Sequence, residues 1–221
     1  MIFSKNVLIA AIAMLAAGAA SASNAVNIKF DSDGLGLVLS TSGTANYETG
    51  ALNYLTQGGK SFLAYCVELQ QDHAVGADGF QSYTIGQFTG NQANRLQGLF
   101  SSSYAGVDTA QEQAAFQTAI WEITHETAAT LSVSPKNGSF YVKSLQGANG
   151  ATNSAFSSLV NGYLSAASSY NGTPKYTVTK LSNGSYQDLV TVSAVPEPSS
   201  YAMLAAGLVA VGFMSRRRQQ R

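Results

Sequence analysis

The chain has few of the residues that support metal binding, disulfide cross-linking or charge-driven recognition. It contains one cysteine, two histidines and 11% charged residues, and its formal net charge is zero. A single cysteine cannot form an intramolecular disulfide. One cysteine and two histidines are too few for a convincing zinc site, even if Glu68 or Asp72 supplied oxygens. We therefore expect no metal site.

Two further absences narrow the class of function. No Gly-rich phosphate loop follows a predicted strand, so we expect no bound cofactor. No serine nucleophile elbow of the kind found in α/β-hydrolases is present. Lys and Arg do not gather in a basic patch and do not alternate with aromatic residues. Nucleic acid is therefore not an expected partner.

The N-terminus has the pattern of a secretory signal peptide. Lys5 precedes an apolar run over residues 7–17, and Ala20-Ser21-Ala22 supplies an Ala-x-Ala cleavage site. We expect residues 1–22 to be removed and the mature protein to be exported.

The C-terminus also has three parts. Pro196, Glu197 and Pro198 precede an apolar segment over residues 201–214, which three arginines follow at 216–218. The segment is short for a membrane span, which needs about 17–25 residues, and the arginines would stay on the cytoplasmic side. A simple C-terminal membrane anchor is the alternative interpretation.

This order resembles the PEP-CTERM sorting signal of Gram-negative bacteria, in which an exosortase recognises Pro-Glu-Pro. The resemblance implies that residues 195–221 hold a precursor in the inner membrane until an exosortase processes it. The protein would then reach the cell surface or extracellular matrix of a Gram-negative bacterium.

Between the two signals, residues 23–194 are enough for one extracellular domain. Strand patterns cover residues 26–30, 35–40, 52–55, 62–68, 79–88 and 140–145, and helical patterns cover 91–100, 108–126 and 154–167. A hairpin around Asn183-Gly184 joins strands at 176–181 and 186–192. This order predicts an α+β fold: a β-sandwich or barrel with an inserted helical layer of about three helices.

The strongest helical pattern runs through the middle of the chain. Asp108 is the expected N-cap, with Gln111 as its partner in a capping box. Gln117 and Trp121 share the apolar face, where Trp121 should be largely buried against the β layer. Acidic residues are expected on the opposite, solvent-facing side: Glu112, Glu122 and Glu126.

An inward-facing Gln117 needs partners for its amide. In one interpretation the amide caps a neighbouring strand or loop. In the other it reacts with the only cysteine: a thiolate attacks the carboxamide, expels ammonia and leaves a thioester that can acylate an amine or hydroxyl.

Two short motifs support the second interpretation. Tyr65-Cys66-Val67-Glu68 and Phe116-Gln117-Thr118-Ala119-Ile120-Trp121-Glu122 resemble the two signatures of bacterial thioester domains, known mainly from Gram-positive surface adhesins. The similarity spans roughly residues 60–127. It implies that Cys66 provides the thiol and Gln117 the acyl group, on a helix whose motif residues Ala119, Ile120 and Trp121 seat the glutamine.

The same resemblance implies a single-use covalent adhesin rather than a turnover enzyme. Its target would be a surface or matrix polymer that bears amines or hydroxyls. The alternative is a non-covalent structural or exopolysaccharide-associated matrix protein that never forms the bond.

Other roles for Cys66 remain open from the residues alone. A buried, inert thiol is common for free cysteine, and an intermolecular disulfide would join two chains. A cysteine hydrolase would pair Cys66 with His73 or His125 as the base.

Overall fold

The computed structural model describes residues 24–43, 46–135 and 137–195, together with positions 203, 206–208 and 211. The expected signal peptide and the residues Pro196, Glu197 and Pro198 lie outside the described residues. Within the described part of the chain, no helix is long and apolar enough to cross a membrane.

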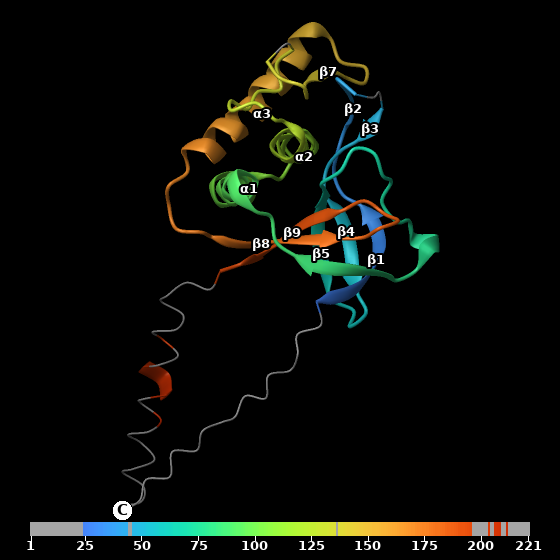
Figure 1. Cartoon of the computed structure of the whole chain (residues 1–221), viewed down its shortest axis with the longest axis vertical. Helices are drawn as coiled ribbons and strands as arrows, with labels where there is room; N and C mark the ends of the chain where they lie inside the picture. The colour runs from blue at the N-terminus through green and yellow to red at the C-terminus, as the bar shows by residue number, and fades with distance from the viewer. Residues whose placement is uncertain are drawn as a thin grey trace, which may run out of the picture.

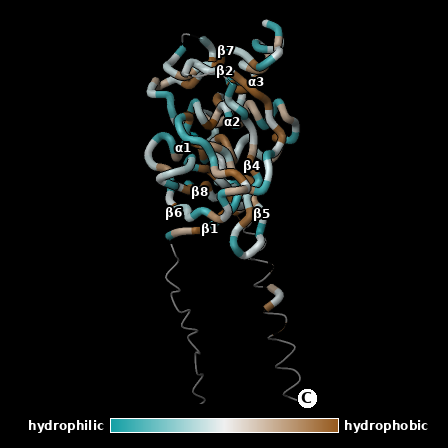
Figure 2. The backbone as a smooth tube through the Cα atoms, turned by 90° about the vertical axis from the view of Figure 1, so that its right-hand side faces the viewer, coloured by the Kyte–Doolittle hydropathy of each residue, from teal (hydrophilic) through white to brown (hydrophobic). Residues whose placement is uncertain are grey.

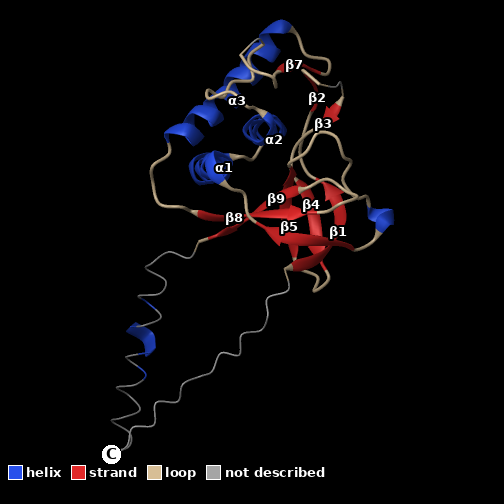
Figure 3. Ribbon diagram, viewed as in Figure 1, coloured by secondary structure: helices blue, strands red, loops and turns tan. Residues whose placement is uncertain are grey.

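Six antiparallel strands close into a barrel, which forms the lower layer of the domain in Figures 1 and 3. Around the barrel the order is β1-β4-β5-β9-β8-β6. The strands are β1 (Ala25–Asp33), β4 (Leu52–Thr56), β5 (Ser61–Cys66), β6 (Gln81–Gly86), β8 (Tyr176–Ser182) and β9 (Leu189–Ala194). Closure leaves no strand of this sheet with a free edge along its whole length.

A second, smaller sheet lies beside the helices at the other end of the domain (Figure 3). It has the order β3-β2-β7. Its strands are β2 (Val38–Thr41), β3 (Tyr47–Glu48) and β7 (Val142–Leu145). This sheet brings residues near 40 against residues near 144, and so ties the start of the domain to the segment after the central helix.

Three α-helices within residues 24–195 form a layer over the barrel (Figure 1). They are α1 (Gly90–Ser103), α2 (Ala110–His125) and α3 (Gly150–Ser169), and the 3₁₀ turns η1 (Gly76–Asp78) and η2 (Tyr104–Gly106) are short. Figure 2 shows the mostly hydrophilic path of α1, whose few large apolar residues, Leu96, Leu99 and Phe100, are all buried. The predicted α+β fold, a barrel with a helical layer, is confirmed.

An aromatic cluster fastens the helical layer to the barrel. Tyr65 on β5 lies 5.2 Å from Phe116 on α2 and 6.3 Å from Phe100 on α1, between ring centroids. Tyr163 on α3 adds a further contact to Phe116 at 5.9 Å. Such edge and tilted ring contacts stabilise beyond the area that they bury. The cluster therefore holds α2 against the strand that carries Cys66.

The start of α2 differs from the prediction. Thr109, not Asp108, is the N-cap: its hydroxyl accepts from the Glu112 N–H at 3.2 Å. Glu112 completes the capping box by accepting from the Thr109 N–H at 2.8 Å. The predicted capping-box partner Gln111 is therefore also wrong by one residue. The sequence allowed either pair, because Asp108 and Thr109 can both cap a helix and each has a Gln or Glu three positions later.

The predicted solvent-facing side of α2 is also wrong for Glu122. Every residue from Ala114 to Ile123 is buried, and Glu122 is 0% exposed. Because α1, α3 and β5 all pack around α2, the helix has no continuous wet face. The two-residue strand β3 was not predicted, since two residues are too few to show alternation.

Candidate functional site

The side-chain amide of Gln117 pairs with the backbone of Cys66. Gln117 Oε1 accepts from the Cys66 N–H at 2.9 Å, and Gln117 Nε2 donates to the Cys66 carbonyl at 2.7 Å. Both residues are buried, with Gln117 1% and Cys66 8% exposed. The amide thus caps a strand, as one interpretation predicts, and the residue that it caps is the only cysteine.

The barrel geometry explains why this backbone is free to receive the amide. The Val67 N–H donates to the Asp188 carbonyl on the β9 side, so the N–H and C=O of Cys66 point to the opposite side of β5. On that side the pairing with β4 ends at Leu52 and Ala64. Gln117 therefore occupies the place where β4 would have continued.

Further side chains of α2 contact the same strand end. The Tyr65 hydroxyl donates to Gln113 Oε1 at 2.6 Å. The Val67 carbonyl accepts from the Thr124 hydroxyl at 3.2 Å and from His125 Nε2 at 2.9 Å. Gln113, Gln117 and Thr124 follow helical spacing, so one side of α2 holds residues 65–67 in a fixed position.

The motif residues beside Gln117 form the packed support of this position. Ala119 and Ile120 are both 0% exposed, and Trp121 is 2% exposed, as its predicted burial requires. Tyr47 on β3 packs against the Trp121 ring with 5.5 Å between centroids, and its hydroxyl donates to the Leu69 carbonyl at 3.0 Å. The contribution of Tyr47 was missed because β3 is too short to show a sequence pattern.

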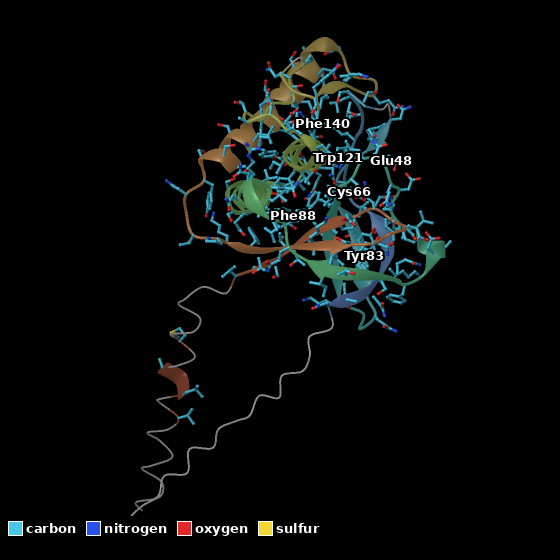
Figure 4. The ribbon with its side chains drawn as sticks, in the orientation of Figure 1. Glu48, Cys66, Tyr83, Phe88, Trp121 and Phe140 are labelled. Carbon is cyan, nitrogen blue, oxygen red and sulfur yellow. The ribbon has the colours of Figure 1, made fainter. Side chains whose placement is uncertain are left out.

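A cavity of about 510 Å³ adjoins the site, and both Cys66 and Trp121 line it. Figure 4 shows these two residues between α2 and the barrel, with Glu48 beyond them at the small sheet. The buried residues Cys66, Trp121 and Leu52 form its inner end, whereas Asp33, Glu48 and Asp72 are exposed at its rim. None of the described lining residues is Lys or Arg. The cavity therefore leads from an acidic rim to the only thiol.

Glycines build one wall of the cavity by allowing two loops to touch. A Cβ on Gly36 would lie 1.5 Å from the Thr49 carbonyl oxygen, and Gly50 has a φ of +121° that favours glycine. The Thr49 hydroxyl donates to the Leu37 carbonyl at 2.6 Å across the same contact. Any side chain at Gly36 would force this wall apart.

Burial disfavours the ionised form of the free Cys66 thiol. It raises the pKa of Cys66 to about 12, and the carboxylate of Asp33 adds to the effect. Catalytic cysteines show the opposite shift, because the thiolate is the nucleophile. A free Cys66 in this environment stays protonated at neutral pH.

The two histidines do not form a nucleophile–base pair with Cys66. Nδ1 of His73 donates to the Ala74 carbonyl at 2.9 Å, and its ring packs 4.9 Å from Phe30. His125 directs Nε2 at the Val67 carbonyl. The raised thiol pKa and these hydrogen bonds oppose the cysteine hydrolase interpretation.

Two buried polar atoms of α2 have no hydrogen-bond partner among the described residues: Trp121 Nε1 and Glu122 Oε2. The other oxygen of Glu122 accepts from the Ser132 N–H at 2.7 Å. Burial raises the pKa of Glu122 to about 7. Of the two groups, only Trp121 lines the cavity.

The comparisons with known proteins address the two ends of the chain separately. Residues 194–218 match the family model described as a PEP-CTERM protein-sorting motif, which confirms the predicted sorting signal. The motif indicates an exported protein that is anchored before processing, and it implies processing by an exosortase. A search of curated proteins gives no match.

Two solved structures from Streptococcus pyogenes are similar to this chain. The N-terminal domain of the pilus tip adhesin Cpa is 16% identical with a TM-score of 0.47, over 68% of this chain and 85% of that one. The N-terminal thioester domain of the fibronectin-binding protein SfbI is 15% identical with a TM-score of 0.47, over 77% of this chain and 94% of that one.

Proposed function

We propose that residues 23–194 form an extracellular domain in which Cys66 and Gln117 are joined by a thioester. The domain then attaches once, covalently, to a surface or matrix polymer that bears amines or hydroxyls. The observation that carries the proposal is the pairing of the Gln117 amide with both backbone polar atoms of Cys66, at 2.9 and 2.7 Å. The motif resemblance identifies the same two residues.

Bond formation is a substitution at the Gln117 carboxamide. The Cys66 sulfur attacks Cδ, the S–C bond forms, the C–N bond breaks, and the thiol proton leaves with nitrogen as ammonia. The Cys66 N–H that donates to Oε1 would stabilise the negative charge that develops on this oxygen. Burial of both residues limits the access of water to the thioester.

Attachment reverses the roles of sulfur and nitrogen. An amine reaches Cδ through the cavity, forms an amide with Gln117, and releases Cys66 as a thiol. Because the raised pKa of Cys66 favours a protonated sulfur, the released group takes up the proton that the amine loses. The acidic rim formed by Asp33, Glu48 and Asp72 favours amines over hydroxyls, since it attracts ammonium groups.

Intact mass and thiol titration test the bond. The wild-type protein should be lighter than its sequence by one ammonia and should resist thiol alkylation even in denaturant. Methylamine should release one thiol per chain. Ethanolamine and ethylene glycol, compared at equal concentration, measure the preference for the amine.

The variants Cys66→Ala and Gln117→Ala should each abolish amine uptake. Gln111→Ala is the matched control, because Gln111 is an exposed glutamine on the same helix; it should retain amine uptake. If unfolded, amine-free wild type alkylates fully at Cys66, no thioester is present. The non-covalent structural or exopolysaccharide-associated matrix protein then becomes the better interpretation.

We further propose that the precursor is held in the inner membrane of a Gram-negative bacterium and released to the cell surface or matrix. The sorting motif supports this proposal. Glu197→Ala should leave the precursor uncleaved in the membrane fraction. Normal processing of this variant would contradict recognition of Pro196-Glu197-Pro198 by an exosortase.

A further inference from the structure

The indole N–H of Trp121 is a buried donor without an acceptor. Trp121 is 2% exposed, and among the described residues Nε1 has no hydrogen-bond partner. A buried donor left unpaired costs about 1–3 kcal/mol. Such a group suggests that its acceptor appears only in another chemical state of the site.

Gln117 can provide that acceptor. It lies four residues before Trp121 on α2, so the two side chains are neighbours on the helix surface. A carboxamide oxygen has two acceptor positions, and the Cys66 N–H occupies one position on Gln117 Oε1. Trp121 lines the same cavity as Cys66, and both residues are labelled in Figure 4.

We propose that the Trp121 indole N–H and the Cys66 backbone N–H together form the oxyanion hole for acyl transfer at Gln117. This inference rests on the proposed thioester. In the amide state, the bond from Nε2 to the Cys66 carbonyl fixes the plane of the carboxamide. Loss of this nitrogen as ammonia removes that constraint, and the acyl oxygen can turn toward the indole.

The amine lone pair attacks Cδ of Gln117, and the carbonyl π electrons move to the oxygen, which accepts from the two N–H donors. When the carbonyl re-forms, the C–S bond breaks with its electrons on sulfur. The proton lost by the amine ends on Cys66, so the products are an amide and a thiol.

Tyr47 helps to hold the Trp121 side chain in a fixed position. The Tyr47 ring packs on the indole, and its hydroxyl bonds to the Leu69 carbonyl on the segment after β5. An oxyanion donor is effective when it is already oriented before the reaction. Tyr170→Phe is a matched control, because it removes a tyrosine hydroxyl that donates to the Thr173 carbonyl and Tyr170 does not line the cavity.

The test replaces Trp121 by its isostere 3-benzothienylalanine, in which sulfur takes the place of the N–H, and also uses Trp121→Phe. Intact mass first establishes that the wild type carries the thioester; its absence there would remove the proposed function itself. The rate of thiol release by methylamine should then fall about 10²–10³-fold in both variants, as for other lost oxyanion donors.

A structural role would give a different result. We expect the isostere to keep the wild-type melting temperature and the half-saturating methylamine concentration, while the maximal rate of thiol release falls. Tyr170→Phe should react at close to the wild-type rate. A folded isostere that is isolated without the thioester also supports the inference, because bond formation passes through the same oxyanion. An isostere that carries the thioester and opens at the wild-type rate overturns it.

Discussion

The two sides of α2 handle buried polar groups differently. On the side toward β5, neutral groups meet the strand end, and Gln117 satisfies both of its polar atoms there. On the other side, carboxyl groups hold the segment that follows the helix. Glu126 accepts from the backbone N–H groups of four residues: Thr127, Ala128, Ser139 and Phe140.

The difference follows from what each side faces. A single strand end offers one N–H and one C=O, which an amide matches and a carboxylate does not. The segment after α2 offers several converging N–H groups, which a carboxylate matches. Glu122 is the exception on that side, because only one of its oxygens is paired and burial raises its pKa. The β5 side therefore matches one strand end with a neutral amide, and the other side matches converging N–H groups with a carboxylate.

The largest expected effect is on stability, when a substitution disrupts the packing on the β5 side of α2. Trp121→Ala should lower the free energy of unfolding by about 3–5 kcal/mol, because it removes a fully buried aromatic side chain and leaves a cavity. Denaturant unfolding measures the change. An unchanged unfolding midpoint would show that the indole is not part of the core.

A smaller expected effect is the pH dependence of the free energy of unfolding that Glu122 causes. Glu122 has a folded pKa of about 7, raised mainly by burial from 4.5. The folded state therefore binds the proton more tightly than the unfolded state. Stability due to this group is fully present below about pH 4.5 and is lost as pH rises through 7. Between pH 5 and pH 8 the wild type should lose about 2–3 kcal/mol relative to Glu122→Gln.

Glu126 provides the contrast for this measurement. Burial acts to raise its pKa, but the N–H groups of Ala128, Phe140, Ser139 and Thr127 together lower it. Its contribution is lost only as pH falls through the lowered pKa. Glu126→Gln should therefore keep most of the dependence between pH 5 and pH 8, with a small decrease because the Glu126 carboxylate helps to raise the pKa of Glu122. Equal slopes for wild type and Glu122→Gln in that range would contradict the assignment to Glu122.

The smallest expected effect concerns the residue at which α2 begins. Thr109→Ala should cost about 1 kcal/mol, because it removes the hydroxyl that accepts from the Glu112 N–H. Asp108→Ala is the control and should change the stability by less than about 0.5 kcal/mol. Thermal unfolding of the two variants compares the caps directly; a larger loss at Asp108 would reverse the correction.

The features that the sequence determined by itself are those with short-range causes. Residue periods of two and 3.6 predicted most strands and all three helices within residues 24–195. The sorting signal is a linear pattern, and the comparison confirms it without any fold. The need of a buried amide for hydrogen-bond partners could also be stated in advance, because Gln117 falls on the apolar face of a helix.

Only the tertiary structure decided what surrounds each residue. Glu122 lies at a helix position that the sequence pattern assigns to the solvent-exposed face. It is buried because other elements pack around α2 as well. Gln117 meets Cys66 across 51 positions because β4 ends early and exposes one backbone edge of β5. The cavity, its acidic rim and the unpaired indole N–H likewise arise from segments far apart in the chain. Local pattern fixes the elements, whereas their mutual packing fixes the chemical environment of each side chain.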